Sequence, residues 1–510
     1  MTGESPGYPD RMLRGLLDRV LVALTLLVLR WFFRRVEVDG RERLPKDRPV
    51  LVVANHSNGL IDPVILVHTL GRVPRFIAKA ALWRPLWVRP FLAAAGMIPV
   101  ARPQDQPDTS ENRRTFSTSH DVLRKGGTVG LFPEGIAHDE PHLAPIRTGA
   151  ARIALGARAA GAEGLAILPI GLAFDDKIGL RSRALARVGE PIDLDAELDD
   201  IVGADGSASE DDPEAVRALT SEIEQRLRAV APDYADRREA RVLARAAEIW
   251  HRSRGGSRLR RQPVGEVPLS DQERLARRLR QAPEATRGRI RDAVARYNLD
   301  LDLTGLRDHQ IAAGYTPLQV LGGFVRTALI VALLAPLWVP GLIINVVPYQ
   351  LASLSGLAMR NPVMKGTLRV FVALAVFPIT WAVVLLLLGV DTLWMGAIAL
   401  ALMPLAGVVA AGIMERLVRA VRAWRGWLGL VERRALLDEV RVDRDRLLRL
   451  VDELVEAPEG REVSEGRDAS QGRDAPERHD APEGGDAPER RDASADAEAP
   501  PERADASSTR

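Results

Sequence analysis

Two polar side chains in the segment VLVVANHSNGLIDPV have the types and the spacing of a catalytic pair. His56 and Asp62 flank a short turn in which Gly59 permits a tight bend. A carboxylate that hydrogen-bonds one imidazole nitrogen fixes the tautomer and leaves the other nitrogen as a general base near neutral pH. Asp62 also precedes a proline, so the alternative is the N-cap of a helix over residues 63–70. By itself the pair leaves catalysis and capping open.

The elements that must position this pair are predicted by short β-branched runs that alternate with helical segments. The runs predict strands over 49–54, 75–79, 96–101, 128–132, 165–172 and 184–189, and the segments between them predict helices over 63–70, 83–95, 114–125 and 147–161. Such alternation is typical of an α/β domain with a mostly buried sheet. We therefore expect the chemistry in the loops that connect these elements.

Three further motifs follow the histidine and aspartate along the chain. They are GMIPVAR from Gly96 to Arg102, FPEG from Phe132 to Gly135, and ILPI from Ile167 to Ile170. In this order the four motifs resemble the four sequence blocks of the glycerolipid acyltransferases, the family that includes glycerol-3-phosphate and lysophosphatidate acyltransferases. The resemblance covers residues 36–194 and implies an α/β acyltransferase domain.

Two departures from the usual family pattern are visible. Five residues separate His56 from Asp62 where the family usually has four, and FPEG is followed by IAHDE instead of threonine, arginine and serine. Both departures resemble one branch, which is found in fungal glycerol-3-phosphate and dihydroxyacetone-phosphate acyltransferases and in many bacterial relatives. We interpret the motif as an intact variant site.

The resemblance implies roles for four of these residues. In the family's mechanism the histidine takes the proton of the acceptor hydroxyl, which attacks the thioester of an acyl-CoA or acyl carrier protein; His56 and Asp62 occupy those positions. Arg102 is implied as a ligand of the acceptor phosphate. Arg147, just before a predicted helix, is a second candidate, because guanidinium groups bind phosphate through two parallel bonds. The alternative for both arginines is a solvated surface charge.

Four more residues are candidates for substrate binding. Glu134 is a candidate ligand of an acceptor hydroxyl, with a structural carboxylate paired to an arginine as the alternative. Gly135 permits close approach of backbone to ligand, and Asn58 and His138 are expected to shape the acceptor pocket. Ser57 lacks the G-x-S-x-G setting of a serine nucleophile.

Composition narrows the chemistry further. The chain has no cysteine, which excludes disulfides, thiolate metal sites and a cysteine nucleophile. We expect no metal and no cofactor beyond acyl-CoA or acyl carrier protein as co-substrate. The formal net charge of +2 gives no reason to expect nucleic acid as a partner.

Hydropathy and charge divide the chain into six predicted parts. These are an interfacial amphipathic helix (1–35), the acyltransferase domain (36–200), a helical domain (201–315), a membrane region (316–415), an amphipathic helical segment (416–457) and a low-complexity tail expected to be disordered (458–510). At the start of the amphipathic segment Arg416, Arg419, Arg422 and Arg425 recur every third residue, as in a helix that lies on a membrane surface.

The membrane region contains apolar stretches over 327–347, 370–390 and 393–414. Basic residues flank the last two stretches and are missing from the turn between them, so that turn should face outward and both flanks the cytoplasm. Pro336 and Pro340 should break the first stretch at its middle. We therefore predict a re-entrant or interfacial hairpin, two true spans and an active site on the cytoplasmic side.

The sequence thus predicts a membrane-associated acyltransferase of phospholipid biosynthesis. Its expected partners are membrane lipids, an acyl thioester donor and a phosphorylated glycerol acceptor, either glycerol-3-phosphate or 1-acylglycerol-3-phosphate. Two alternatives stay open: a remodelling acyltransferase acting on a lysophospholipid or another lipid alcohol, and an inactive lipid-binding scaffold. The presence of His56, Asp62, Arg102 and Glu134 together argues against the scaffold.

Overall fold

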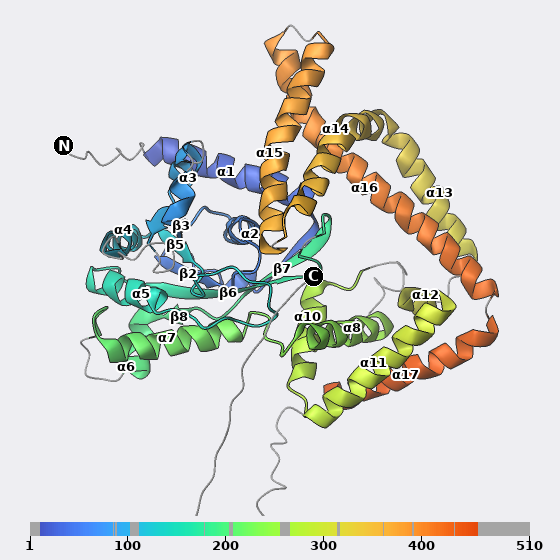
Figure 1. Cartoon of the computed structure of the whole chain (residues 1–510), viewed down its shortest axis with the longest axis horizontal. Coiled ribbons are helices and arrows are strands. Elements are labelled where there is room, and N and C mark those ends of the chain that lie inside the picture. The colour runs from blue at the N-terminus through green and yellow to red at the C-terminus, as the bar shows by residue number, and fades with distance from the viewer. Residues whose placement is uncertain are drawn as a thin grey trace, which may run out of the picture. The chain divides into compact units, whose positions relative to one another are not determined.

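A computed structural model describes residues 11–84, 86, 89–101, 112–177, 179–202, 208–254, 266–313, 317–360, 362–389, 392–432 and 434–456 (Figure 1). The predicted low-complexity tail, 458–510, lies outside the described residues. The described chain combines an α/β domain with a helical region and a set of long apolar helices, in agreement with the predicted fold class.

The centre of the α/β domain is a mixed sheet of eight strands. They are β1 (Phe33–Asp39), β2 (Val50–Ala54), β3 (Arg75–Lys79), β4 (Ile98–Val100), β5 (Thr128–Leu131), β6 (Ala166–Phe174), β7 (Ser182–Val188) and β8 (Ile192–Asp193). Their order is β1-β7-β6-β2-β5-β3-β4, and β8 pairs with β6. Strand β2 lies between β6 and β5 and is parallel to both. All six predicted strands are present, so the catalytic histidine candidate follows a central strand.

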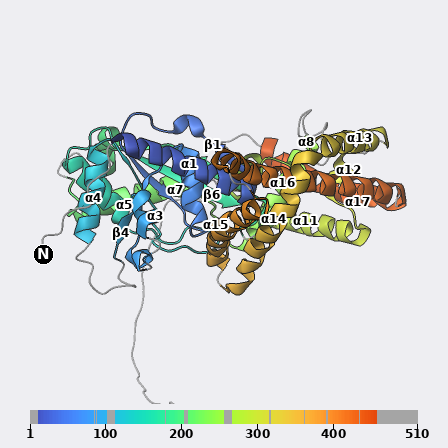
Figure 2. The same cartoon turned by 90° about the horizontal axis from the view of Figure 1, so that it is seen from above.

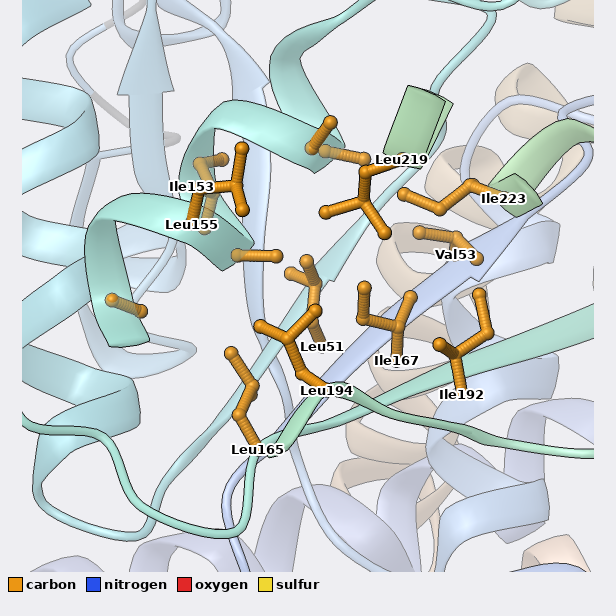
Figure 3. Packing of buried hydrophobic residues seen from close by; sticks show 14 of the residues in the cluster. Leu51, Val53, Ile153, Leu155, Leu165, Ile167, Ile192, Leu194, Leu219 and Ile223 are labelled. Carbon is orange, nitrogen blue, oxygen red and sulfur yellow. The ribbon is translucent and has the colours of Figure 1, made fainter. Parts of the chain in front are cut away.

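Helices cover both faces of this sheet. They are α1 (Arg11–Phe32), α2 (Ile61–Leu70), α3 (Arg89–Ala94), α4 (Asn112–Arg124), α5 (Gly149–Ala159), α6 (Leu194–Val202) and α7 (Pro213–Arg228), with short 3-10 turns at Arg41–Arg43 and Ala80–Trp83. Leu51 and Val53 pack toward α5 and α7 on one face (Figure 3), whereas Val50, Val52 and Ala54 pack with α1 and α2 on the other. Side chains alternate across a strand, so burial on both faces accounts for the unbroken apolar run of β2.

Two boundaries of the α/β domain differ from the prediction. The interfacial helix was expected to reach residue 35, but α1 ends at Phe32 and β1 begins directly after it. Strand β1 pairs in parallel with β7, which gives its mixed polar and apolar sequence one buried face. Helix α7, expected in a separate helical domain, packs against α5 and the sheet through residues such as Leu219 and Ile223.

A second core forms among helices that follow the α/β domain. These are α8 (Arg237–Arg254), α10 (Leu269–Arg280), α11 (Glu284–Thr304), α12 (Asp308–Ala313) and α17 (Arg434–Glu456). Leu447 and Val451 of α17 are fully buried in this core beside Tyr297 of α11. The apolar face of α17, which lies in the predicted amphipathic segment, is covered by α8 and α11.

The apolar helices are α13 (Pro317–Leu333), α14 (Ala335–Ser355), α15 (Pro362–Leu387) and α16 (Leu393–Glu432), with a 3-10 turn at Gly356–Ala358. Three stretches, Ala335–Ala358, Met364–Leu387 and Leu393–Arg425, are long and apolar enough to cross a membrane. Helices α14, α15 and α16 pack together (Figure 2). Helix α16 runs without interruption across the predicted boundary at residue 415.

The first apolar stretch is divided, but not where the sequence suggested. The helix ends at Leu333 and restarts at Ala335, whereas Pro340 lies inside the continuous α14. Pro336 occupies the first turn of α14, where its missing N–H needs no partner within the helix, so the proline starts a helix instead of breaking one. Together α13 and α14 form an inverted V in Figure 1. The re-entrant hairpin and the count of two true spans stay predictions.

Candidate active site

His56 and Asp62 are hydrogen-bonded to each other. His56 Nδ1 lies 2.9 Å from Asp62 Oδ2, and the same oxygen accepts the backbone N–H groups of Ser57 and Asn58, each at 2.7 Å. The Asp62 side chain is completely buried. The turn between the two residues therefore folds back onto the carboxylate, as the catalytic interpretation predicted.

The alternative role of Asp62 as a helix N-cap is wrong. Helix α2 begins at Ile61 and its N-cap position is Leu60, so Asp62 already lies in the first turn. Its carboxylate accepts from amides of the preceding turn, not from amides of α2. The negative charge therefore holds the loop that carries His56.

The imidazole of His56 is held on its face as well as at its Nδ1 edge. It stacks on Phe132, with ring centroids 4.0 Å apart and an interplanar angle of 15°. The side chain retains 19% of its exposure, and no hydrogen-bond partner for Nε2 occurs among the described residues. With Nδ1 bonded to a carboxylate, the tautomer that donates from Nδ1 leaves the Nε2 lone pair available to a ligand.

Glu134 connects the FPEG loop to the histidine loop. Its buried carboxylate accepts the His56 backbone N–H at 2.6 Å and the Ala144 N–H at 2.8 Å, and it pairs with His138 Nε2. His138 in turn donates its backbone N–H to the His56 carbonyl at 3.1 Å. Because His138 Nδ1 accepts the Glu140 N–H at 3.3 Å, the ring proton is on Nε2 and points to Glu134.

These contacts define a structural role for Glu134. Both carboxylate oxygens already have protein partners, and histidine 138 takes the place that the sequence assigned to an arginine. Binding of an acceptor hydroxyl by Glu134 stays a prediction, and so does a contact of His138 with the acceptor.

Gly135 and Arg147 lie against each other beside this loop. Gly135 has a φ of +70°, and a Cβ at this position would lie 2.8 Å from Arg147 Nε. Arg147 donates its backbone N–H to the Pro133 carbonyl at 2.8 Å, and its side chain is exposed. Helix α5 begins two residues after Arg147 at Gly149, and the first amides of a helix have no partner within it. A cation and a helix N-terminus together can bind an anion.

The remaining predicted binding residues are Arg102 and Asn58. Arg102 lies outside the described residues. Asn58 is 1% exposed and donates its side-chain amide to the Lys177 carbonyl at 3.1 Å. A contact between Asn58 and an acceptor would require this packing to change, and its binding role stays a prediction.

Several residues that support the site were missed by the sequence analysis. Asn55 exchanges two side-chain hydrogen bonds with the backbone of Leu172, at 3.0 and 2.7 Å, which locks the end of β2 to β6. Thr367 at the start of α15 accepts the Leu60 N–H at 3.1 Å, and Gly366 lies against Asn58. An Asn before the histidine was a visible signal, but nothing in the sequence linked residues 366 and 367 to a loop about three hundred positions away.

The described residues contain no group of three or more His, Asp or Glu side chains placed to hold a metal ion. The chemistry visible at the site is that of a histidine oriented by a buried carboxylate, with an exposed arginine beside Gly135 of the FPEG loop.

The segment that carries these residues is similar to known acyltransferases. The family model described as Acyltransferase matches residues 35–173. Glycerol-3-phosphate O-acyltransferase 2 of Saccharomyces cerevisiae is 34% identical over 226 residues, which cover 42% of this chain and 28% of the yeast protein. An uncharacterised acyltransferase of Schizosaccharomyces pombe is 24% identical over 421 residues, 64% of this chain and 60% of that protein.

A chloroplast 1-acyl-sn-glycerol-3-phosphate acyltransferase of Arabidopsis thaliana is 28% identical over 149 residues, 29% of this chain and 38% of the plant protein. The crystal structure of the 1-acyl-sn-glycerophosphate acyltransferase of Thermotoga maritima aligns with a TM-score of 0.32 and 20% identity over 44% of this chain and 83% of that chain. The chain thus spans less than two thirds of the length of the yeast and plant relatives that it matches. The match to the Acyltransferase family model thus includes the residues His56, Asp62 and Glu134.

Proposed function

We propose that this protein is a membrane-associated acyltransferase that transfers a fatty acyl group from an acyl thioester to glycerol-3-phosphate or 1-acylglycerol-3-phosphate. The observation that carries the proposal is the geometry of His56, whose Nδ1 is bonded to the buried Asp62 while Nε2 has no partner among the described residues. The names of the yeast and plant relatives support the acceptor class.

In the proposed reaction, His56 Nε2 accepts the proton of the acceptor hydroxyl as that oxygen attacks the thioester carbonyl. Asp62 stabilises the imidazolium that forms and keeps the ring in place through Nδ1. The thioester bond breaks, an ester bond forms, and the leaving thiolate receives the proton from Nε2. Both substrates are bound together, so no acyl-enzyme forms.

Arg147 is the proposed ligand of the acceptor phosphate, together with the amides at the start of α5. The guanidinium is exposed and lies beside Gly135, in the loop that Glu134 connects to His56. Arg102 is proposed as a second cation on the strength of the sequence motif alone.

Association with a membrane is supported by the three apolar helices and by the contact of α15 with the histidine loop. Through Thr367, the base of an apolar helix holds the turn that carries His56. A lipid acceptor or acyl chain at the membrane surface would then lie near the proposed base. We also propose that the active site faces the cytoplasm, where acyl thioesters are made.

The sidedness can be tested by cysteine labelling, because the chain has no native cysteine. Ser182 is a poor site for this purpose, since it is buried in β7. Exposed Asp121 in α4 and Thr392 between α15 and α16 are suitable positions. In intact cells an impermeant reagent should label a cysteine at 392 and not one at 121; the reverse pattern would contradict a cytoplasmic site.

The decisive experiment is an acceptor panel with purified full-length protein in detergent. Thiol release from acyl-CoA can be followed with a thiol reagent without background from the protein, because the chain has no cysteine. Glycerol-3-phosphate, 1-acylglycerol-3-phosphate, dihydroxyacetone phosphate and a lysophospholipid are compared, and product formation from acyl carrier protein tests the other donor. Preference for the lysophospholipid would favour the remodelling alternative. Absence of turnover with every acceptor and both donors would favour the scaffold.

A further inference from the structure

A cavity of about 490 Å³ lies between α1, α14, α16 and the loop before β7. Its lining contains no residue of the His56 turn or of the FPEG loop, so it is separate from the proposed active site. The volume is within the range of small-molecule sites, about 300 to 1,000 Å³. The cavity is therefore large enough for part of a lipid.

The walls of this cavity differ in chemistry from one part to another. Leu342 and Val346 of α14 and Met414 and Val418 of α16 supply apolar surface. Four arginines and two glutamates also line it, which leaves two positive charges in excess: Arg34, Arg181, Arg419, Arg422, Glu266 and Glu415. Apolar walls beside an excess of guanidinium groups match an amphiphile with an anionic head.

Not all of these arginines are neutralised by the protein. Arg34 pairs with Glu266 at 2.9 Å, but its Nε is buried and has no hydrogen-bond partner among the described residues. Arg419 reaches Glu415 only at 4.0 Å. Arg422 is exposed and has no ion pair within the described part of the chain. Donors therefore remain for an external anion.

Arg181 gives the cavity a fixed edge. It has a left-handed backbone with φ of 62°, which is strained for a residue with a side chain. Its Nε donates to Glu415 of α16 at 2.6 Å, and its Nη1 donates to the Arg30 carbonyl at the end of α1 at 2.6 Å. One arginine thus joins the α/β domain, α1 and α16 at the cavity.

The position along α16 indicates a membrane interface. About 20 helical residues cross the hydrocarbon core of a bilayer, which is about 30 Å thick. Helix α16 begins at Leu393, so a span that starts there ends just before Glu415, and Arg419 and Arg422 follow at the level of lipid headgroups. A headgroup phosphate would lie at this height, whereas a soluble anion would gain nothing from the apolar walls.

We propose that this cavity binds one anionic glycerophospholipid of the surrounding bilayer, with its phosphate at Arg419 and Arg422 and an acyl chain along α14 and α16. The bound lipid fills the space between α1 and the apolar helices and so joins the acyltransferase domain to the membrane region. It is an additional site, distinct from the sites for the acyl donor and the acceptor.

The test measures lipid binding to the full-length protein in detergent by native mass spectrometry. Dioctanoyl phosphatidylglycerol is the probe, because it is neither substrate nor product of the proposed reaction. Saturable binding of one molecule is expected, with phosphatidylcholine binding at least about 10-fold more weakly and millimolar inorganic phosphate failing to compete. Equal binding of phosphatidylcholine, or full competition by phosphate, would refute an anionic-lipid site.

Variants locate the site. Arg419→Gln with Arg422→Gln should weaken binding by at least about 10-fold, the loss expected when charged hydrogen bonds are removed. Arg425→Gln is the matched control, because this arginine lies on the same helix and does not line the cavity. An equal loss in the control would show that binding is non-specific.

Two more variants keep the test decisive. Ala411→Trp should fill the cavity and abolish lipid binding while every arginine remains. This variant tests the site independently if the Arg419→Gln, Arg422→Gln protein fails to fold. His56→Ala should bind the lipid like the unchanged protein, which separates this site from the proposed catalysis. Undiminished binding in Ala411→Trp would place the lipid elsewhere.

Discussion

Replacement of Asp62 by asparagine separates the charge of this side chain from its geometry. Asp62 Oδ2 accepts three hydrogen bonds, from His56 Nδ1 and from the backbone N–H groups of Ser57 and Asn58. An asparagine would put its carbonyl oxygen at this position, because its NH₂ group would face three donors there. All three bonds would remain without the negative charge, and the NH₂ group would take the place of Oδ1, which is buried and has no hydrogen-bond partner among the described residues.

The magnitude follows from the difference between charged and neutral hydrogen bonds. A bond to a charged group contributes about 1.5 to 3 kcal/mol and a neutral one about 0.5 to 1.5 kcal/mol, so three weakened bonds should lower the free energy of unfolding by about 3 kcal/mol. The imidazolium formed during proton transfer would lose its counter-charge as well. We expect kcat to fall by up to the ~10²- to 10⁴-fold associated with general-base catalysis.

The assay is thiol release from acyl-CoA, with thermal unfolding measured on the same samples. Asp212→Ala is the matched control, because Asp212 is a true N-cap that accepts the N–H groups of Glu214 and Ala215 at the start of α7. It should cost about 1 kcal/mol of stability and leave kcat per folded molecule unchanged. If Asp62→Asn also leaves kcat per folded molecule unchanged, Asp62 does not assist His56 and the proposed mechanism is wrong.

Three further perturbations test other parts of the molecule. Gly366→Ala would put a methyl group 2.7 Å from Asn58 Oδ1, and this overpacking should lower stability by about 1 to 3 kcal/mol and also lower kcat. The control is Gly412→Ala, because a methyl group there would have no atom within 4 Å. Equal stability and kcat in the two variants would exclude coupling between α15 and the His56 turn. Arg147→Ala should raise KM for a phosphorylated acceptor about 10-fold or more and leave KM for acyl-CoA unchanged, with partial recovery by lysine; equal effects on both substrates would make Arg147 structural. Burial lowers the pKa of His309 from 6.5 to about 4. Between these pH values the imidazole is protonated in the unfolded chain and neutral in the folded chain, so the free energy of unfolding should fall by about 3 kcal/mol as the pH drops from about 6.5 to 4. In His309→Gln, the free energy of unfolding measured across this pH range should no longer show this decrease. An unchanged dependence on pH would show that other groups cause it.

The sequence by itself determined the α/β core and the short turn that joins His56 to Asp62. Five consecutive apolar residues in β2 predict a strand buried on both faces, and the structure has helices on both sides of it. The spacing of His56 and Asp62 across a glycine-containing turn also predicts their contact, because short loops leave few ways to close. Such features depend on residues near one another in the chain, where local geometry decides the outcome.

Tertiary structure decided those features that depend on contacts with segments distant in the sequence, or for which the local sequence pattern fits more than one structure. Asp62 precedes a proline and looks like an N-cap, but the unpaired amides of the His56 turn take its carboxylate instead. The amphipathic face of α17 suits a membrane surface as well as a protein core. In the structure this face is buried against α8 and α11. The same holds for Thr367 and Gly366, whose contacts with the His56 turn depend on packing between segments about three hundred residues apart. Hydropathy records how apolar a face is, and only the fold determines what covers it.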